Sequence, residues 1–266
     1  MSSSFPRTPA DTPLDVAVIG AGFAGMYMLH RLRSAGFSVK AFEAGPELGG
    51  TWYWNRYPGA RCDVESVQYS YSFDESIQQE WTWSERFATQ PEILRYANFV
   101  ADRLDLRKDI TFGVRIIAGA FDQASNQWVL ETDAGTKIHA RQVVTAVGCL
   151  SSSNLPQIEG IDSFQGRTIH TSDWPHDGVD FTGQRVAIIG TGSSAIQAIP
   201  EIAKQAAHLT VFQRTPNFSV PARNQPLSEK TVQWWKENYP GLRKTARETM
   251  RSGTIYDLPT KPAIGT

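Results

Sequence analysis

The sequence is poor in cysteine, with only Cys62 and Cys149 among its 266 residues. These two residues lie 87 positions apart and form neither a Cys-x-x-Cys pair nor a metal-ligand cluster. The sequence therefore predicts no metal site and no disulfide framework. Free thiols are typical of a reducing compartment, and we expect a cytoplasmic protein.

Long apolar runs and an excess of either charge are also missing. No run approaches the roughly 18 apolar residues that a membrane-spanning helix needs, and 26 Lys and Arg residues nearly balance 27 Asp and Glu residues. Such a chain has no positive field that would recruit nucleic acid or an anionic membrane. We expect small-molecule partners, and the sequence leaves the oligomeric state open. Residues 1–13, rich in Ser, Thr and Pro, are predicted to be a disordered tail.

Glycine, in contrast, is arranged in two motifs, the first of which follows a β-branched run at residues 14–19. Such a run is typical of a strand buried on both faces of a parallel sheet. Gly20, Gly22 and Gly25 then form G-x-G-x-x-G, which permits a tight turn and close approach of the backbone to a pyrophosphate at a helix N-terminus. The hydrophobic positions expected of that helix are Ala24, Met28, Leu32 and Ala35, with Gly36 at its end.

A carboxylate marks the end of the next predicted strand, residues 38–42. Glu43 lies 23 residues after Gly20, where an acidic side chain can accept hydrogen bonds from both ribose hydroxyls of a dinucleotide. The same charge would repel a 2′-phosphate. The first motif therefore predicts a site for FAD or NAD and not for NADP.

The second motif repeats this unit after another predicted buried strand at residues 185–189. It reads G-x-G-x-x-A from Gly190 to Ala195, and Ser193 and Ser194 add hydroxyls where phosphate oxygens would lie. Pro200 is expected to interrupt the following helix after about two turns and to bend it.

A basic residue follows the next predicted strand, residues 209–213. Arg214, followed by Thr215, lies 24 residues after Gly190, almost the offset of Glu43 in the first unit. A guanidinium there can bind a 2′-phosphate bidentately, which predicts a site selective for NADP(H). The alternative is an ordinary surface arginine at a strand end.

These features predict an α/β fold with two Rossmann-like dinucleotide-binding units and a short helical C-terminal segment. One acidic and one basic site imply a flavoprotein in which NADPH reduces FAD. The helix predicted at residues 231–251 carries Arg243, Arg247 and Arg251 in a stripe that we expect to be a solvated face and not a phosphate site. The expected ranges are 14–150 for the FAD domain, 151–183 for a linker, 184–226 for the NADP domain and 227–266 for the helical segment.

Two longer segments carry a family resemblance. Phe164, Gly166, His170, Trp174 and Pro175 have the spacing F-x-G-x-x-x-H-x-x-x-W-P, and a second stretch runs from Gly49-Gly50-Thr51-Trp52 through Tyr57-Pro58-Gly59 to Asp63. Both resemble signatures of the Baeyer-Villiger monooxygenases, class B flavoproteins, with the phenylacetone and steroid monooxygenase branch most similar. The resemblance extends from about residue 15 to residue 227.

The resemblance implies an enzyme that uses FAD, NADPH and O2 to insert one oxygen atom beside a ketone carbonyl, giving an ester or lactone. It implies a catalytic role for Asp63, for which a turn or cap aspartate is the alternative. His170 suits a general base because its ordinary pKa is near neutrality, although a role in coupling the linker to the domains is preferred and a core histidine is the alternative.

The motifs and the resemblance together give two sets of cofactor positions. Predicted FAD positions are Gly20, Gly22, Phe23, Ala24, Gly25, Glu43, Gly50, Thr51, Trp52, Asp63, Tyr69, Ile116 and Gly148, of which the last three could instead be packing or turn residues. Predicted NADP positions are Arg61, Cys62, Gly190, Thr191, Gly192, Ser193, Ser194, Ala195, Gln197, Arg214 and Thr215. Tryptophan is dense between Trp52 and Trp83, which suits a flavin pocket or an ordinary core.

The sequence departs from the family in length and in one catalytic group. Members of the family are roughly twice as long, and the family's catalytic arginine has no match here. We therefore expect an N-terminal portion that binds FAD weakly and does not oxygenate ketones by itself. Three alternatives stay open: a class B enzyme that oxygenates nitrogen or sulfur, a non-catalytic nucleotide-binding fragment, and a pyridine nucleotide-disulfide reductase, which would require a dithiol.

Overall fold

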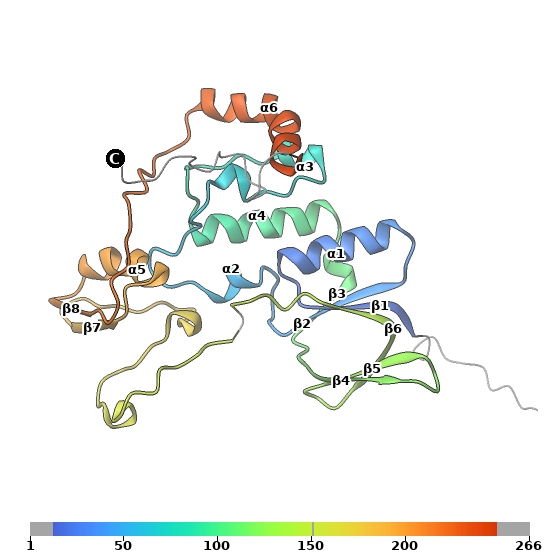
Figure 1. Cartoon of the computed structure of the whole chain (residues 1–266), viewed down its shortest axis with the longest axis horizontal. Helices are drawn as coiled ribbons and strands as arrows, with labels where there is room; N and C mark the ends of the chain where they lie inside the picture. Colours follow the sequence, from blue (N-terminus) through green and yellow to red (C-terminus); the bar gives the residue numbers. More distant parts are fainter. Residues whose placement is uncertain (1–12, 151, 249–266) are drawn as a thin grey trace, which may run out of the picture. The chain divides into compact units, whose positions relative to one another are not determined.

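A computed structural model describes residues 13–150 and 152–248, and Figure 1 shows their secondary structure. The chain divides into two compact units, residues 1–58 with 93–182 and residues 59–92 with 183–266. Segment 59–92 thus belongs with the second unit, whereas the sequence placed it within the FAD range 14–150. Its hydrogen bonds explain this difference, since residues 84–87 pair with residues 224–227 far along the chain.

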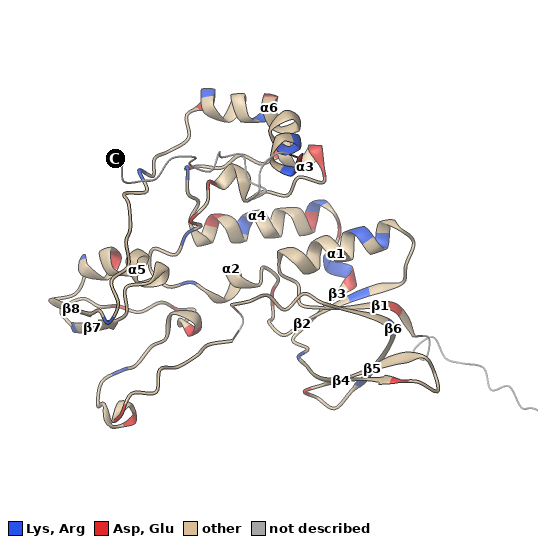
Figure 2. Ribbon diagram, in the orientation of Figure 1, with Lys and Arg blue, Asp and Glu red and all other residues tan. Residues whose placement is uncertain are grey.

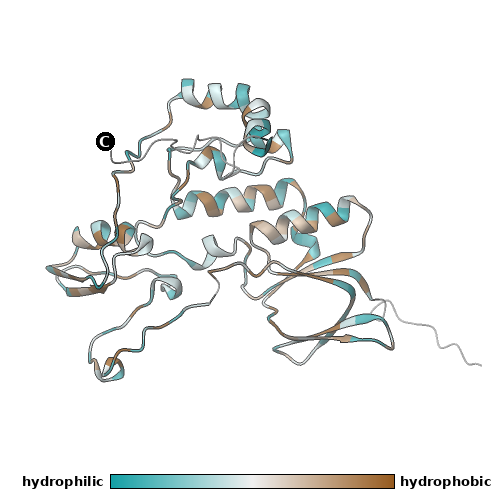
Figure 3. Ribbon diagram, viewed as in Figure 1, coloured by the Kyte–Doolittle hydropathy of each residue, from teal (hydrophilic) through white to brown (hydrophobic). Residues whose placement is uncertain are grey.

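The first unit contains a six-stranded sheet in the order β3-β2-β1-β6-β5-β4. Strands β3, β2, β1 and β6 are parallel, and β6, β5 and β4 form an antiparallel extension. Figure 3 shows hydrophobic residues along these strands, and their core is formed by Ala17, Phe42, Leu130 and Ala140. The strands are β1 (Leu14–Ile19), β2 (Val39–Glu43), β3 (Ile110–Phe112), β4 (Ile116–Asp122), β5 (Gln127–Thr132) and β6 (Lys137–Thr145).

Helices α1 and α4 lie on the same side of this sheet in Figure 1. Helix α1 begins directly after the first glycine loop, as predicted, but its buried residues are Gly25, Met26 and Leu29 and not the expected series from Ala24. The buried face starts at Gly25 because that residue packs on the loop itself. The unit also contains α1 (Phe23–Ser34), α2 (Thr51–Trp54), most of α4 (Gln90–Arg103), and the 3-10 turns η3 (Arg107–Asp109), η4 (Ile161–Ser163) and η5 (Thr171–Asp173).

The second unit contains a parallel pair of strands with the helix between them. These elements are β7 (Arg185–Ile189), α5 (Ser193–Ala203) and β8 (His208–Phe212), joined by η2 (Ser66–Gln68), α3 (Glu75–Glu80) and α6 (Glu229–Glu248). The expected burial of β7 on both faces is wrong, since Ile189 is 67% exposed. Among the described residues β7 pairs with β8 alone, so the strand lacks a neighbour on its other edge.

A second correction in this unit concerns Pro200 in α5. The predicted interruption at Pro200 is wrong, because α5 continues through this residue to Ala203. A proline removes a single amide donor, and the helix ends within one turn of it, so few hydrogen bonds are lost.

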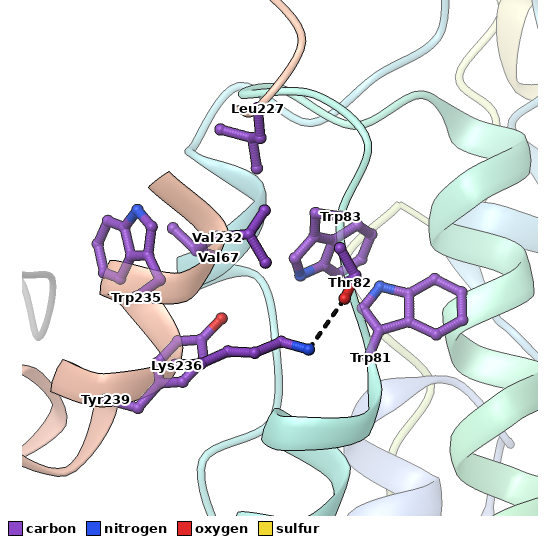
Figure 4. Close-up of a pocket in the computed structure, with 9 residues that line it drawn as sticks. All are labelled: Val67, Trp81, Thr82, Trp83, Leu227, Val232, Trp235, Lys236 and Tyr239. Atoms are coloured by element: carbon purple, nitrogen blue, oxygen red, sulfur yellow. Dashed lines mark hydrogen bonds between the residues drawn. The ribbon is translucent and has the colours of Figure 1, made fainter. Parts of the chain in front are cut away.

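Helix α6 packs through an aromatic cluster in the second unit. Figure 4 shows Trp81 and Trp83 lining a small cavity together with Trp235, Lys236 and Tyr239 of α6, and the Lys236 ammonium donates to the Thr82 hydroxyl at 2.9 Å. Trp81 and Trp83, two of the tryptophans between Trp52 and Trp83, therefore pack against α6.

The arginine stripe predicted on this helix is only partly solvated. Arg243 donates to the carbonyl oxygens of Val67 at 2.7 Å and Ser70 at 3.3 Å, and its guanidinium lies over the ring of Tyr239. The expected solvated face is therefore wrong at Arg243 and holds for the exposed Arg247. Arg251 lies outside the described residues.

Candidate functional site

The first loop requires glycine at two positions, at Gly20 because of its backbone conformation and at both Gly20 and Gly25 because a Cβ has no room. Gly20 has φ +100°, and a Cβ there would lie 2.6 Å from the carbonyl oxygen of Ala146, next to the end of β6. A Cβ at Gly25 would lie 2.0 Å from the carbonyl oxygen of Gly20. The first turn of α1 therefore packs directly on the loop, which holds the helix N-terminus at the end of β1.

The second half of the loop is in contact with the Gly49-Gly50 segment. The Gly49 amide donates to the carbonyl oxygen of Ala21 at 3.1 Å, and a Cβ at Gly50 would lie 2.9 Å from the Cα of Gly22. No side chain caps α1 at Gly22, and its first turn has no acidic residue. Figure 2 shows basic residues at the other end of α1, where Arg31 and Arg33 complement the helix dipole. The N-terminal amides of α1 are thus suited to an anion such as a pyrophosphate.

Hydrogen bonds from backbone amides hold Glu43 next to the first loop. The residue is 5% exposed, and its two carboxylate oxygens accept from the backbone amides of Ala21 at 2.7 Å and Gly45 at 2.8 Å. Each carboxylate oxygen has a second lone pair, so the group retains the capacity to accept from ribose hydroxyls. These two backbone amides fix and orient the carboxylate.

The second loop reproduces the first loop residue by residue. Gly190 has φ +107°, compared with +100° at Gly20, and each amide donates at 2.8 Å to a carbonyl oxygen of the neighbouring strand, that of Phe212 or of Phe42. The helix caps Gly192 and Gly22 also share their extended backbone conformation. The predicted repetition of the unit is therefore present in the backbone geometry as well as in the glycine spacing.

The repetition also aligns the residues that would recognise the ribose. Ile19 pairs with Phe42 in the first unit, and Ile189 pairs with Phe212 in the second. The residue that follows is Glu43 in one unit and Gln213 in the other, so Arg214 lies one position beyond the equivalent of Glu43. The sequence held this signal in the two offsets of 23 and 24 residues.

The surroundings of the second loop are open. A Cβ at Gly190 or Gly192 would meet nothing within 4 Å, and Arg214 and Thr215 are exposed. The Thr191 hydroxyl accepts from the side-chain amides of Gln213 at 2.9 Å and Asn217 at 3.2 Å. The loop has room for a nucleotide at Gly192, whereas the open space at Gly190 corresponds to the side that Ala146 fills in the first unit. Two side chains fix the conformation of the loop.

Two other predicted NADP positions lie together in the second unit. The Arg61 amide donates to Oε1 of Gln197 at 3.2 Å, and Nε2 of Gln197 donates to the Arg61 carbonyl oxygen at 3.1 Å. Nη1 of Arg61 is 3.6 Å from Oε2 of Glu85. Gln197 belongs to α5, so it ties the end of the Gly49–Asp63 stretch to the helix of the second loop.

The remaining predicted residues are spread over both units. Cys62 is buried, and burial raises the pKa of its thiol to about 11, which suits an inert side chain better than a cofactor contact. Asp63 is exposed, and Tyr69 ends the turn η2 in the second unit. Ile116 packs on the core of the first unit, whereas Gly148 is exposed with φ +73°. Their roles stay predictions.

His170 has a local structural role in the linker. Its Nδ1 accepts from the Ser172 amide at 3.3 Å and lies 2.7 Å from the Ser172 hydroxyl, so it caps the turn η5. An accepting Nδ1 places the proton of a neutral imidazole on Nε2. Trp174 of the same signature is buried against Phe181 at a ring distance of 6.0 Å. Both contacts order the linker, while a catalytic role for His170 stays a prediction.

Two features are absent from the described part of the chain. No group of three or more His, Cys, Asp or Glu side chains there is arranged to hold a metal ion. Among the same residues, no helix has the length and apolar character needed to cross a membrane.

Comparison with known proteins identifies the family. A family model described as pyridine nucleotide-disulphide oxidoreductase matches residues 14–238. The chain belongs to this family. Its members include disulfide reductases, but the two cysteines of this chain are free thiols in different units, so the shared feature is the pair of dinucleotide-binding folds.

Similar proteins confirm the resemblance drawn from the sequence. The chain is 45% identical over 229 residues to a Baeyer-Villiger monooxygenase of Pseudooceanicola batsensis, covering 86% of this chain and 42% of that protein. It is 48% identical over 229 residues to phenazine N-monooxygenase PhzNO1 of Lysobacter antibioticus, with the same two coverages. A solved structure of oxidized steroid monooxygenase bound to NADP is 54% identical with a TM-score of 0.89, covering 94% of this chain and 48% of that one.

These comparisons also show what share of each relative's length the chain covers. It spans less than half the length of the curated relatives that it matches. The homologues are Baeyer-Villiger and related flavin monooxygenases.

Proposed function

We propose that this chain provides the FAD-binding and NADPH-binding folds of a Baeyer-Villiger monooxygenase. The whole protein would convert a ketone, O2, NADPH and a proton into an ester or lactone, NADP and water. Bound FAD would supply the oxygen-activating chemistry, with NADPH as the electron donor.

One observation carries this proposal: two loops with the same backbone are followed by side chains of different charge. The buried carboxylate of Glu43 is suited to the ribose hydroxyls of FAD. The exposed guanidinium of Arg214 is suited to a 2′-phosphate. The pattern matches the cofactor pair that a flavin monooxygenase needs, and relatives with that activity support it.

The residues of the chain would bind and orient these cofactors. Amides at the N-terminus of α1 would contact the pyrophosphate of FAD, and Gly22 and Gly50 keep the adjoining backbone bare of side chains. The amides of α5 would do the same for NADPH beside Gly192. We further propose that the protein is cytoplasmic. We also propose that Asp63 lies near the reaction centre.

A second candidate function is oxygenation of a nitrogen atom. The similarity to phenazine N-monooxygenase favours it, because that relative is 48% identical to this chain over 229 residues. The two functions use the same cofactors and differ in the substrate atom that is oxygenated.

Product identification decides between them. The whole protein is supplied with NADPH, ¹⁸O-labelled O2 and either a ketone or an aromatic amine, and products are analysed by mass spectrometry. The proposal predicts an ester or lactone that carries one ¹⁸O atom. N-oxide formed from the amine without ketone oxidation would favour the second candidate, and NADPH oxidation without an oxygenated product would contradict both.

A further inference from the structure

We propose that Gln197 is a positioning residue, which holds Asp63 relative to helix α5 through hydrogen bonds to the backbone of Arg61. Because Asp63 is itself proposed to lie near the reaction centre, this role rests on the proposed function and deepens it. The place of Gln197 directly after the second glycine motif predicted a nucleotide contact, whereas the structure shows its carboxamide bonded to the chain itself.

The Asp63 segment, residues 59–63, is extended and has one backbone neighbour in the second unit. Residues 60 and 62 exchange backbone hydrogen bonds of 2.8 and 3.0 Å with the stretch 88–90, which forms an antiparallel bridge to the segment. Successive residues of an extended chain direct their amide and carbonyl groups to opposite sides. The amide and the carbonyl group of Arg61 therefore point to the other edge of the segment, away from the stretch 88–90.

Gln197 occupies that other edge. Its Oε1 accepts from the Arg61 amide at 3.2 Å, and its Nε2 donates to the Arg61 carbonyl oxygen at 3.1 Å. The carboxamide thus bonds both backbone groups of Arg61, as a residue of a third strand would. Part-buried backbone groups need such partners, so these two bonds hold the Asp63 segment against the side chain of one helical residue.

The backbones of the segment and of α5 are also in contact. Gly59 has φ +77°, and a Cβ there would lie 2.3 Å from the carbonyl oxygen of Gln197. Gln197 is one turn beyond the N-terminal amides of α5 that would bind the pyrophosphate of NADPH. A single helical turn therefore connects the nucleotide site to Arg61, and the exposed Asp63 lies two residues further along the chain.

This arrangement makes turnover, and not nucleotide affinity, depend on Gln197. Without its two bonds, the Asp63 segment keeps its pairing with the stretch 88–90 but loses its attachment to the side chain on α5. A displacement of about 1 Å of a group that acts in the reaction is enough to lower a rate by about 100-fold. The N-terminal amides of α5 do not depend on the carboxamide, so the nucleotide should bind as before.

The first measurement uses the 266-residue chain and needs no enzymatic activity. Gln197→Met keeps the length of the side chain and removes both bonds, and circular dichroism confirms folding. Hydrogen exchange measured by mass spectrometry should be about tenfold faster in the peptide that covers residues 59–65. The dissociation constant for adenosine 2′,5′-bisphosphate, measured by calorimetry, should stay within about twofold of the wild-type value.

Two further variants support this measurement. Ile196→Met introduces the same side chain at the adjoining exposed position of α5 and should leave both quantities unchanged. Gln197→Asn, whose amide is one methylene too short to bond both groups of Arg61, should behave like Gln197→Met. Unchanged exchange in both Gln197 variants would overturn the inference, as would binding that is about tenfold weaker, because Gln197 would then be a nucleotide contact.

The second measurement is a double-mutant cycle on the whole protein. Gln197→Met should lower kcat about tenfold or more and leave KM for NADPH within about threefold. In an Asp63→Asn background the same substitution should lower kcat by less than about twofold, because Gln197 acts through Asp63.

A purely structural role for Gln197 predicts independent losses, so losses that multiply in the double variant would overturn the inference. Wild-type turnover in Asp63→Asn would also overturn it. A wild-type protein that forms no oxygenated product would instead contradict the proposed function, and the exchange and binding measurements would then decide whether Gln197 holds the Asp63 segment.

Discussion

Among single residues, Glu43 and Gln213 show how one scaffold can hold two different ligands. Glu43 is the last residue of β2 and Gln213 directly follows β8, and both contact the residue after the first glycine of their loop. Only Glu43 is charged and buried. Because the backbones of the two glycine loops have the same conformation, the choice of ligand depends on these side chains and on Arg214.

Cysteine reactivity provides a test at the same scale. Since burial raises the pKa of the Cys62 thiol to about 11, its reactive thiolate is scarce near neutral pH, whereas Cys149 is exposed. Iodoacetamide at pH 8 should therefore modify Cys149 in the native protein and Cys62 only in denaturant, as measured by peptide mass spectrometry. Native Cys149→Ser should remain unlabelled, and rapid labelling of Cys62 in that variant would contradict the buried position.

The same shift has a consequence for stability. The pKa of Cys62 is raised in the folded state above its ordinary value of 9.0, so the thiol form is favoured by folding. This contribution is fully present below about pH 9 and is lost as the pH rises toward 11. Cys62→Ala should reduce the fall in unfolding free energy across that window, as measured by urea denaturation; an unchanged slope would contradict the shift.

Among the elements, the loop-helix junctions of the two units differ in packing. A Cβ at Gly25 would lie 2.0 Å from the carbonyl oxygen of Gly20, whereas the equivalent residue of the second unit is Ala195, which carries a Cβ. At the helix cap Gly192, a Cβ would meet nothing within 4 Å. Gly25→Ala should therefore destabilise the chain by about 3 kcal/mol or more, despite the higher helix propensity of alanine. Gly192→Ala should cost less than about 1 kcal/mol and weaken nucleotide binding instead. Urea unfolding measures the difference, and equal losses would refute it.

Arg243 contributes more to the packing of α6 than the pattern of arginines in the sequence indicated. Arg243 donates to carbonyl oxygens at the turn η2 and covers the Tyr239 ring. Arg243→Ala should lower the free energy of unfolding by about 2 kcal/mol, since charged hydrogen bonds and packing are lost together. The exposed Arg247→Ala is the matched control, with an expected change within about 0.5 kcal/mol. A similar effect of both substitutions would show that the contacts of Arg243 do not stabilise α6.

At the scale of the whole molecule, local motifs were predictable and long-range partners were not. Strand β2 ends at Glu43, one residue after the predicted end, and both glycine loops connect a strand to a helix as predicted. Strand β8 ends at Phe212, one residue before the predicted end, and that single position separates Gln213 from Arg214 as the equivalent of Glu43. Periodicity and propensity place strand ends only approximately, while register is set by pairing with another strand.

The failures have the same origin. Three features depend on segments that are distant in the sequence. They are the exposure of β7, the contacts of Arg243, and the membership of residues 59–92 in the second unit. A polar side chain on a predicted helix is expected to be solvated unless a tertiary acceptor exists, and the sequence near Arg243 does not show the carbonyl groups of residues 67–70.

The central claim is that the two loops bind different nucleotides, and crossed binding measurements test it most directly. Dissociation constants for FAD and for adenosine 2′,5′-bisphosphate are measured on the wild-type chain, Glu43→Gln and Arg214→Ala. We predict that Glu43→Gln weakens FAD at least tenfold and leaves the bisphosphate within about twofold. Arg214→Ala should weaken the bisphosphate by about 2 kcal/mol and leave FAD unchanged. Equal losses of both ligands in either variant, or the reverse pattern, would contradict the assignment.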